Sequence, residues 1–274
     1  MTTGQARAGA EWLRLREPAD AAARAPELVD EVRAYLPTNG EAVIHDLGCG
    51  SGSMARWLAV QLTGPQHWVM YDRDAELLTL AAADPPGEAS DGAPVTIETR
   101  QGDITRLRPE ELAGAALITA SALLDMMTAE ELGRFVATCA GPGCPVLIVL
   151  SVTGRVELTP SDPFDHRVAD AFNAHQRRTT SAGRLLGPDA AGAAVDGFTR
   201  LGLDVLVRPS PWRLGPGQAA LAAEWFTGWL AAACEQRPEL GAEAPSYAKR
   251  RLAEAAAGRL SVTVDHLDLL ARPS

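Results

Sequence analysis

The chain has 274 residues, of which 46% are hydrophobic and 22% are charged, and its formal net charge is −10. This composition is that of an ordinary globular protein and excludes disorder as the main state. The acidic balance, with no concentrated basic stripe to offset it, disfavours nucleic acid as a partner. No apolar run is long enough to span a membrane and the N-terminus lacks the apolar region of a signal peptide, so we expect a cytoplasmic protein without a membrane partner.

The first part of the chain, residues 11–36, has leucines and valines at helical spacing, and Pro18 and Pro26 are expected to divide it into pieces. The pattern then changes to an apolar run, residues 42–46, that ends in an acid. A glycine-rich segment follows at residues 48–52, and apolar residues at helical spacing follow that. This order predicts a strand, a tight loop and a helix.

Strand-like and helical segments continue to alternate up to residue 151. The predicted strands are residues 67–71, 95–100, 116–120 and 145–151, and the predicted helices are residues 75–83 and 129–138. Strands that alternate with helices in this way predict an α/β fold, in which a doubly wound and mostly parallel sheet is covered by helices on both faces.

Beyond residue 151 the alternation loosens. Helices are predicted at residues 163–178, 188–198, 218–234 and 246–258, and strands at residues 203–208 and 260–266. We therefore expect one domain with a Rossmann-like sheet of seven strands. Its parts are an N-terminal helical cap (1–37), a cofactor-binding half (38–152), a helical insertion after the fifth strand that caps the substrate (153–187), and the rest of the sheet with added helices (188–274). The insertion should lie near the carboxyl ends of the strands, where ligands bind in such folds.

The glycine loop indicates which ligand binds there. Gly48 and Gly50 directly follow the first strand, so the chain can turn sharply and its backbone can approach a ligand. A dinucleotide-binding loop would need glycine at position 53, where the chain has Ser53, and this disfavours an NAD-linked enzyme. The observed pattern of Asp46, Gly48, Gly50 and Gly52 favours a smaller ligand that lacks a pyrophosphate.

The segment HDLGCGSGSMARWLA, residues 45–59, resembles motif I of the class I S-adenosylmethionine-dependent methyltransferases. Three further motifs of that family follow in order: Tyr71-Asp72-Arg73, then Gln101-Gly102-Asp103-Ile104, and then the segment from Leu117 to Asp125. The resemblance covers residues 42–151. It implies S-adenosylmethionine as the cofactor and methyl transfer to a small molecule as the activity.

By this resemblance, Asp72 accepts the ribose hydroxyls, Asp103 accepts the adenine amino group, and Ser121 lies beside the methionine part. The full set of cofactor-binding residues that it implies is Asp46, Gly48, Cys49, Gly50, Asp72, Arg73, Asp103, Ile104 and Ser121. One arginine of the N-terminal helices (Arg14, Arg16 or Arg24) is expected to pair with the methionine carboxylate, although ion pairs with Glu17 or Asp20 explain these arginines almost as well.

The residues that would bind the methyl acceptor are predicted from their spacing in the sequence, without the family resemblance. His166, Asp170, Asn173 and Arg177 share one face of the predicted helix 163–178, opposite three apolar side chains. This spacing makes His166 a candidate general base, and Asn173 and Arg177 candidate substrate ligands, unless the face is simply solvated. Asp125, just past the fourth strand, is a second candidate for base or substrate anchor.

Other interpretations stay open. Trp212 and Trp225 either line a pocket for an aromatic acceptor or pack in the core. The four cysteines lack the paired spacing of a zinc site, so no metal is expected. An S-adenosylmethionine-binding protein with a regulatory or non-methylating role would carry the same motifs. The methylated atom and the oligomeric state are not determined by the sequence.

Overall fold

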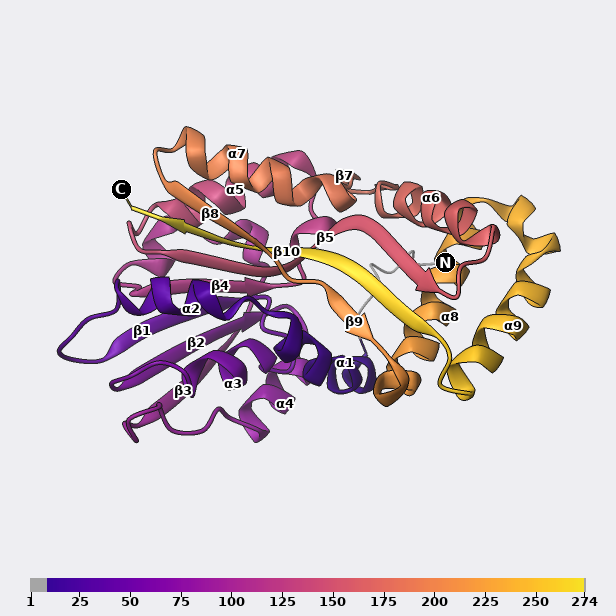
Figure 1. The fold of residues 1–274 in the computed structure, drawn as a ribbon. Coiled ribbons are helices and arrows are strands. Elements are labelled where there is room, and N and C mark those ends of the chain that lie inside the picture. The colour runs from indigo at the N-terminus through magenta and orange to yellow at the C-terminus, as the bar shows by residue number, and fades with distance from the viewer. Residues whose placement is uncertain (1–8, 274) are drawn as a thin grey trace.

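A computed structural model describes residues 9–273; residues 1–8, which belong to the expected N-terminal cap, and residue 274 lie outside the described residues. Its centre is a twisted sheet with the strand order β3-β2-β1-β4-β5-β10-β8, and β9 pairs with β10 (Figure 1). The strands of this sheet are β1 (Ala42–Leu47), β2 (Gln66–Asp72), β3 (Val95–Gln101), β4 (Leu117–Ser121), β5 (Val146–Thr159), β8 (Asp204–Pro209), β9 (Trp212–Leu214) and β10 (Ser261–Arg272).

The first five strands of the sheet are parallel, and β10 alone runs antiparallel between β5 and β8. The predicted doubly wound, mostly parallel sheet is therefore confirmed, with β9 as an additional short strand. Because the parallel strands all end at one edge, the loops after β1, β2 and β4 meet there.

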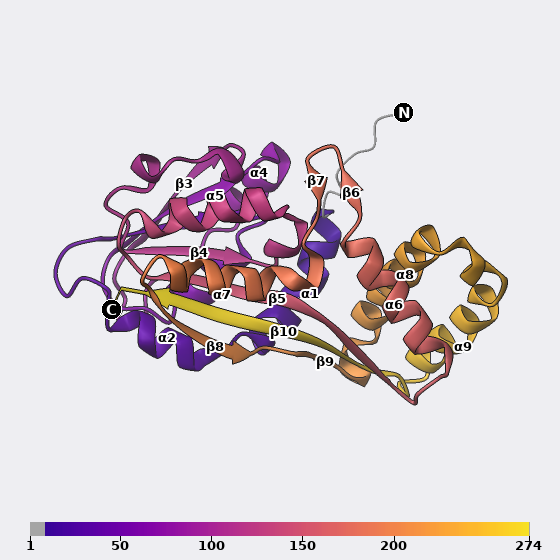
Figure 2. The same ribbon diagram turned by 90° about the horizontal axis from the view of Figure 1, so that it is seen from above.

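Helices cover both faces of this sheet (Figure 2). On one face α5 and α7 pack over a core that includes Leu47 and Phe135, and on the other α2, α3 and α4 pack over a core that includes Ile44 and Leu58. Ile44 and Leu47 belong to opposite cores because strand side chains alternate between faces. The helices are α1 (Ala10–Ala23), α2 (Pro26–Arg33), α3 (Ser53–Ala59), α4 (Ala75–Ala83), α5 (Ala129–Ala140), α6 (Phe164–Gln176), α7 (Ala190–Arg200), α8 (Ala219–Gln236) and α9 (Ala244–Ala256).

Pro18 does not divide the N-terminal segment as the sequence predicted, because α1 continues through it from Ala10 to Ala23. A proline inside a helix removes one hydrogen bond. Trp12, Leu15 and Ala19 of this helix pack against a buried apolar cluster, and that burial outweighs the lost bond. Pro26 does begin a new helix, since it occupies the first turn of α2, where its missing N–H is not needed.

The strands β5 and β10 are longer than predicted and form a ribbon that leaves the sheet. β5 runs on to Thr159 rather than ending at residue 151, and β10 runs to Arg272 rather than ending at residue 266. Their far ends pair with each other, with Ser261 opposite Thr159. At the end of this ribbon lie α6, α8 and α9, which we call the three-helix unit (Figure 1). The expected insertion, residues 153–187, supplies only α6, and α8 and α9 come from the C-terminal part of the chain.

The three-helix unit has a core of its own. Phe164 and Val168 of α6 pack with Phe226 and Trp229 of α8 and with Tyr247 of α9. At its edge lies a small hairpin of β6 (Thr179–Thr180) and β7 (Gly183–Arg184).

A buried ion pair ties α9 to the start of α6. Arg251 is 1% exposed, and its guanidinium donates to both carboxylate oxygens of Asp165 at 2.6 and 2.7 Å. Asp165 also accepts from the Tyr247 hydroxyl, and Glu254 gives Arg251 a second carboxylate at 2.9 Å. Such a pair is costly to break, because either partner alone would be left as an uncompensated charge.

In the span 9–273 we find no helix with both the length and the apolar character needed to cross a membrane.

Candidate functional site

The loop after β1 bends where the sequence has its glycines. Gly48, Gly50 and Gly52 have φ values of 73°, 54° and 88°. In this left-handed region a side chain is strained. A Cβ on Gly52 would also lie 2.9 Å from the Met70 Cε atom. Backbone strain and close packing together explain why this loop is built from glycine.

Asp72, at the end of β2, is connected to this loop. Its Oδ2 accepts from the Gly50 N–H at 2.9 Å, and its Oδ1 accepts from the Asp74 N–H at 2.9 Å. The side chain is half-buried, and each oxygen keeps a lone pair for a further donor. The structure therefore brings the predicted ribose acceptor directly beside the glycine loop.

Asp46 lies near the end of β1, just before the loop, and its side chain is buried, with 1% of the residue exposed. Its Oδ1 accepts from the Thr119 hydroxyl at 2.7 Å, and its Oδ2 has no hydrogen-bond partner within residues 9–273. Burial raises the pKa of this carboxyl to about 6, against the opposing effects of Thr119 and Arg24. Cys49 is a buried thiol in the loop whose pKa is raised by burial, so it is neutral and unreactive.

Arg24 is a buried cation above the loop. It is 2% exposed, and it donates at 3.3 Å to the Ser53 carbonyl, the Ser53 hydroxyl and the Ser121 hydroxyl. Within residues 9–273 it forms no ion pair, and its Nε has no partner. Its guanidinium also lies 5.1 Å from the Trp57 ring centroid. Burial lowers the pKa of Arg24, and nearby Asp20 opposes that effect.

A buried carboxylate holds the connection between α1 and α2, which carries Arg24. Asp268 of β10 accepts from the Ala25 N–H at 2.8 Å and from the Leu150 N–H at 2.7 Å. Leu150 has a φ of 58°, which turns its N–H toward this carboxylate. The N-terminal helices are thus attached to the sheet next to Arg24, whose guanidinium faces the loop.

The other two candidate arginines have different surroundings. Arg14 is exposed, and Arg16 is paired with Asp20 at 2.9 Å.

Asp125 lies just past β4, in the short helical turn Leu124–Met126, and its carboxylate lies near the end of α6. Gln176 Nε2 lies 3.5 Å from its Oδ2. Burial raises the pKa of Asp125 to about 6, although the charges of Arg16 and Arg178 act in the opposite direction. Sequence reasoning missed Gln176 and Arg178, because no motif marks the end of α6 as part of this region.

Asp103 and Ile104 follow β3, at the same edge of the sheet. Asp103 is exposed and accepts from the Thr105 N–H at 3.0 Å and the Thr105 hydroxyl at 2.7 Å. Ile104 is 9% exposed, and its Cδ1 would lie 3.8 Å from a Cβ on Gly48. Arg73 is exposed next to Asp72, and its carbonyl accepts from the Gln101 amide. All nine predicted cofactor residues therefore gather around the ends of β1 to β4.

The predicted acceptor residues of α6 are not gathered with them. His166 is exposed near the start of α6, ten residues and so about 15 Å along the helix from Gln176, which contacts Asp125. Asn173 Nδ2 donates to the Gly154 carbonyl at 2.8 Å, and Arg177 makes a two-point ion pair with Asp189 at 2.6 and 2.7 Å. Asn173 thus connects α6 to β5, and Arg177 connects α6 to the start of α7.

The two tryptophans have different surroundings. Trp212 is buried and donates its indole N–H to Asp20 at 2.9 Å, and the Arg16 guanidinium lies 4.9 Å from its ring centroid. Trp225 stacks on Trp229 at 5.2 Å in the core of the three-helix unit. Trp225 is therefore half-buried and packs against this core, whereas Trp212 of β9 contacts α1. Between residues 9 and 273, no group of three or more metal-ligating side chains is placed to hold an ion.

Comparisons with known proteins agree with this geometry. Residues 44–141 match the sequence model of a family described as "Methyltransferase domain". No curated protein matches the sequence. Among solved structures, the YcgJ protein from Bacillus subtilis is similar at 12% identity and a TM-score of 0.50, with 91% of this chain and 100% of that chain covered. At this identity the likeness shows a shared fold.

Two further similar structures come from other bacteria. The cyclopropane synthase MmaA2 from Mycobacterium tuberculosis is 13% identical, with 96% of this chain and 94% of that chain covered and a TM-score of 0.49. A SAM-dependent methyltransferase from Geobacter sulfurreducens, solved with S-adenosyl-L-homocysteine, is 16% identical, with coverage of 95% and 98% and a TM-score of 0.42.

Proposed function

We propose that this chain is a class I S-adenosylmethionine-dependent methyltransferase, which binds S-adenosylmethionine as its cofactor and methylates a small-molecule acceptor. The match of residues 44–141 to the methyltransferase family model supports this proposal. The cofactor supplies an electrophilic methyl group on a sulfonium centre. Transfer of that group is a direct displacement, so the protein's work is to position two reactants and to exclude water.

The observation that carries the proposal is the environment of Arg24. A guanidinium that is 2% exposed, has only neutral oxygens at 3.3 Å and keeps one buried N–H without an acceptor is an incomplete arrangement. Asp20, Asp46 and Asp268 act on Arg24 only through their charges, and the carboxylate of the cofactor's methionine part would supply a direct anionic partner. Ser53 and Ser121, which already contact Arg24, would lie beside that carboxylate and help to orient it.

The adenosine part is assigned to the ends of β2 and β3. Asp72 would accept the two ribose hydroxyls with its remaining lone pairs, while its bonds to Gly50 and Asp74 hold the carboxylate in place. Asp103 would accept the adenine amino group, and Ile104 and the stem of Arg73 would cover the ring. Gly48 and Cys49 contribute backbone that approaches the ligand closely, and Asp46 fixes the loop from below through Thr119.

Asp125 is the residue we assign to the acceptor side. It lies beyond the same strand end as Ser121, within reach of the region where the methyl group would be presented. With a pKa of about 6, it is largely ionised at neutral pH and can still take up a proton readily. Such a base is needed only when the accepting atom carries a proton that must leave, as in a hydroxyl or an ammonium group. Asp125 would otherwise anchor the acceptor.

His166 has no part in this proposal, because its distance along α6 separates it from Asp125 and from the loop. Asn173 and Arg177 act as positioning residues: their contacts with Gly154 and Asp189 hold α6 so that its last turn faces Asp125.

Calorimetry with S-adenosylhomocysteine tests the cofactor assignment. We expect one site per chain, and no binding at millimolar ligand would end the proposal. Incubation with methyl-labelled cofactor and fractionated small-molecule extracts then tests the transfer. Label that moves into a small molecule supports the proposed activity. Tight cofactor binding with no transfer to any fraction would favour the regulatory or non-methylating role instead.

A further inference from the structure

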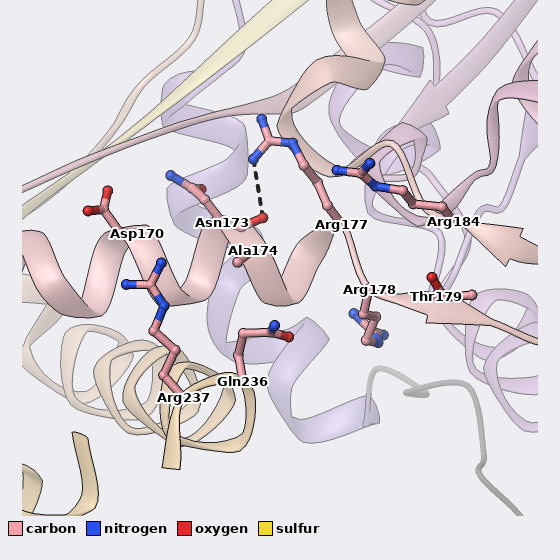
Figure 3. Close-up of a pocket in the computed structure, with 9 residues that line it drawn as sticks. All are labelled: Asp170, Asn173, Ala174, Arg177, Arg178, Thr179, Arg184, Gln236 and Arg237. Atoms are coloured by element: carbon pink, nitrogen blue, oxygen red, sulfur yellow. Dashed lines mark hydrogen bonds between the residues drawn. The ribbon is translucent and has the colours of Figure 1, made fainter. Parts of the chain in front are cut away.

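An open groove of about 830 Å³ lies along the last turns of α6, at the edge of the three-helix unit (Figure 3). One wall comes from α6, another from the end of α8, and a third from the hairpin β6–β7. A volume of this size is within the range of small-molecule sites. Its lining is polar, which distinguishes it from the apolar pockets that take uncharged ligands.

The lining has an unusual charge. Four arginines face the groove, namely Arg177, Arg178, Arg184 and Arg237, and Asp170 is the one acidic residue among the nine that line it. This concentration of positive charge occurs in a chain whose formal net charge is −10. A cationic groove on an acidic protein attracts anions locally while the rest of the surface repels them.

The four arginines are not equally available. Arg177 is held by its two-point ion pair with Asp189, and Arg178 donates to the His175 carbonyl at 3.2 Å. For Arg184 and Arg237, no ion pair occurs within the described part of the chain. Figure 3 shows Arg237 extending from the end of α8 toward α6, and Arg184 extending from the hairpin toward Arg177.

The groove adjoins the candidate active site through three consecutive residues. Gln176 is buried and faces Asp125, while Arg177 and Arg178 line the groove. Arg178 is also close enough to Asp125 for its charge to lower that carboxyl's pKa. The last turn of α6 therefore contributes residues both to the surroundings of Asp125 and to the lining of the groove.

We propose that the methyl acceptor is an anionic small molecule, and that Arg184 and Arg237, from different walls of the groove, bind its carboxylate or phosphate groups while its reacting atom lies at Asp125. This inference rests on the proposed function, since it names the substrate class of the same site. Arginine suits the role because its planar group presents paired donors that match both carboxylate and phosphate oxygens. Asp170, across the groove, would favour acceptors that also carry a positive group.

Citrate and pyrophosphate are suitable probes, because they present carboxylates and phosphates respectively. Each is titrated calorimetrically at low ionic strength into the full chain saturated with S-adenosylhomocysteine, so that the glycine loop and Arg24 are occupied. We expect at least one of them to bind at a single site. The double variant Arg184→Gln/Arg237→Gln should weaken that binding by about 10-fold or more. The matched control, Arg200→Gln/Arg208→Gln, removes two exposed arginines that are not among the residues lining the groove, and it should leave the anion binding unchanged.

The outcomes separate the two proposals. Equal anion binding by the wild type and the groove variant, or no binding of either probe to the wild type, overturns the anionic-acceptor inference even if the cofactor binds. If S-adenosylhomocysteine does not bind but the anion does, and only the groove variant loses it, the groove is an anion site and the methyltransferase proposal fails. Binding of one probe and not the other identifies whether carboxylate or phosphate is preferred.

Discussion

Arg24→Gln is the substitution that probes the cofactor site most directly. Glutamine is neutral and its amide ends at the position of the arginine Nε, two bonds short of the Nη atoms that contact Ser53 and Ser121. It therefore removes the positive charge and those contacts while keeping the aliphatic part of the side chain. A hydrogen bond to a charged group contributes about 1.5–3 kcal/mol. At about 1.4 kcal/mol per tenfold change, the affinity for S-adenosylhomocysteine should fall about 10- to 150-fold.

Two ligands distinguish a direct contact from a structural role. S-adenosylhomocysteine carries the amino acid part, and 5′-methylthioadenosine lacks it. If Arg24 pairs with the carboxylate, calorimetry should show the loss for the first ligand, and the second should bind the variant as it binds the wild type. Arg33→Gln, an exposed arginine of α2, is the matched control and should affect neither ligand.

The reasoning would be refuted if Arg24→Gln weakened both ligands to the same extent, because Arg24 would then only support the fold around the loop. It would equally be refuted if a folded variant, with an unfolding midpoint close to that of the wild type, kept full affinity for S-adenosylhomocysteine.

Four further predictions concern other parts of the molecule. Asp72→Asn replaces one acceptor oxygen by a donor, so the preference for adenosine over 2′,3′-dideoxyadenosine, measured by calorimetry, should shrink by about tenfold; an unchanged preference would remove Asp72 from the ribose site. Because the pKa of Asp125 is raised to about 6, its basic form is lost as the pH falls through 6, and the rate of label transfer should fall over the same pH range. Asp125→Asn should abolish this fall at low pH. A fall that persists in the variant would assign the titration to another group. Asp165→Asn leaves the buried Arg251 with Glu254 as its one carboxylate partner, so the free energy of unfolding in urea should fall by about 3 kcal/mol. Arg250→Gln breaks a more exposed pair with Asp162 and should lower it by less than about 1 kcal/mol. Similar losses for the two variants would mean that burial does not determine how much these pairs stabilise the fold. Gly52→Ala adds a Cβ at a φ of 88° and 2.9 Å from Met70, and thermal unfolding should report a destabilisation of about 1–3 kcal/mol; a neutral result would show that the loop relaxes without strain.

The local sequence pattern was sufficient to predict the strands and loops of the cofactor half of the molecule. The residues from Asp46 to Ser121 lie at strand ends, and parallel strands bring their ends to one edge of the sheet whatever the details of packing. For that reason the chain alone predicts that Asp46, Asp72, Asp103 and Ser121 lie near one another, and the structure places them at this edge. The sequence does not distinguish Arg24 from Arg14 and Arg16, because all three lie in the same N-terminal segment and only the structure shows their burial and ion pairing.

The acceptor side shows the limit of periodicity. Helical spacing predicts that His166, Asp170, Asn173 and Arg177 share one face of α6, and in the structure Asp170, Asn173 and Arg177 line the same groove. It carries no information on which end of the helix approaches the sheet. The structure places Gln176 of the last turn beside Asp125, and His166 about 15 Å along the helix from Gln176.

The amino-acid order by itself determined the alternating strands and helices, the glycine bend and the acids that follow each strand, since these depend on neighbours within a few residues. Only the tertiary structure decided that β5 and β10 continue as a ribbon and that α6, α8 and α9 form one unit at its end. It also decided that a buried arginine from the first helices faces the bend. These arrangements arise from contacts between segments as much as 243 residues apart, as between Ala25 and Asp268, and such contacts leave no local pattern in the chain.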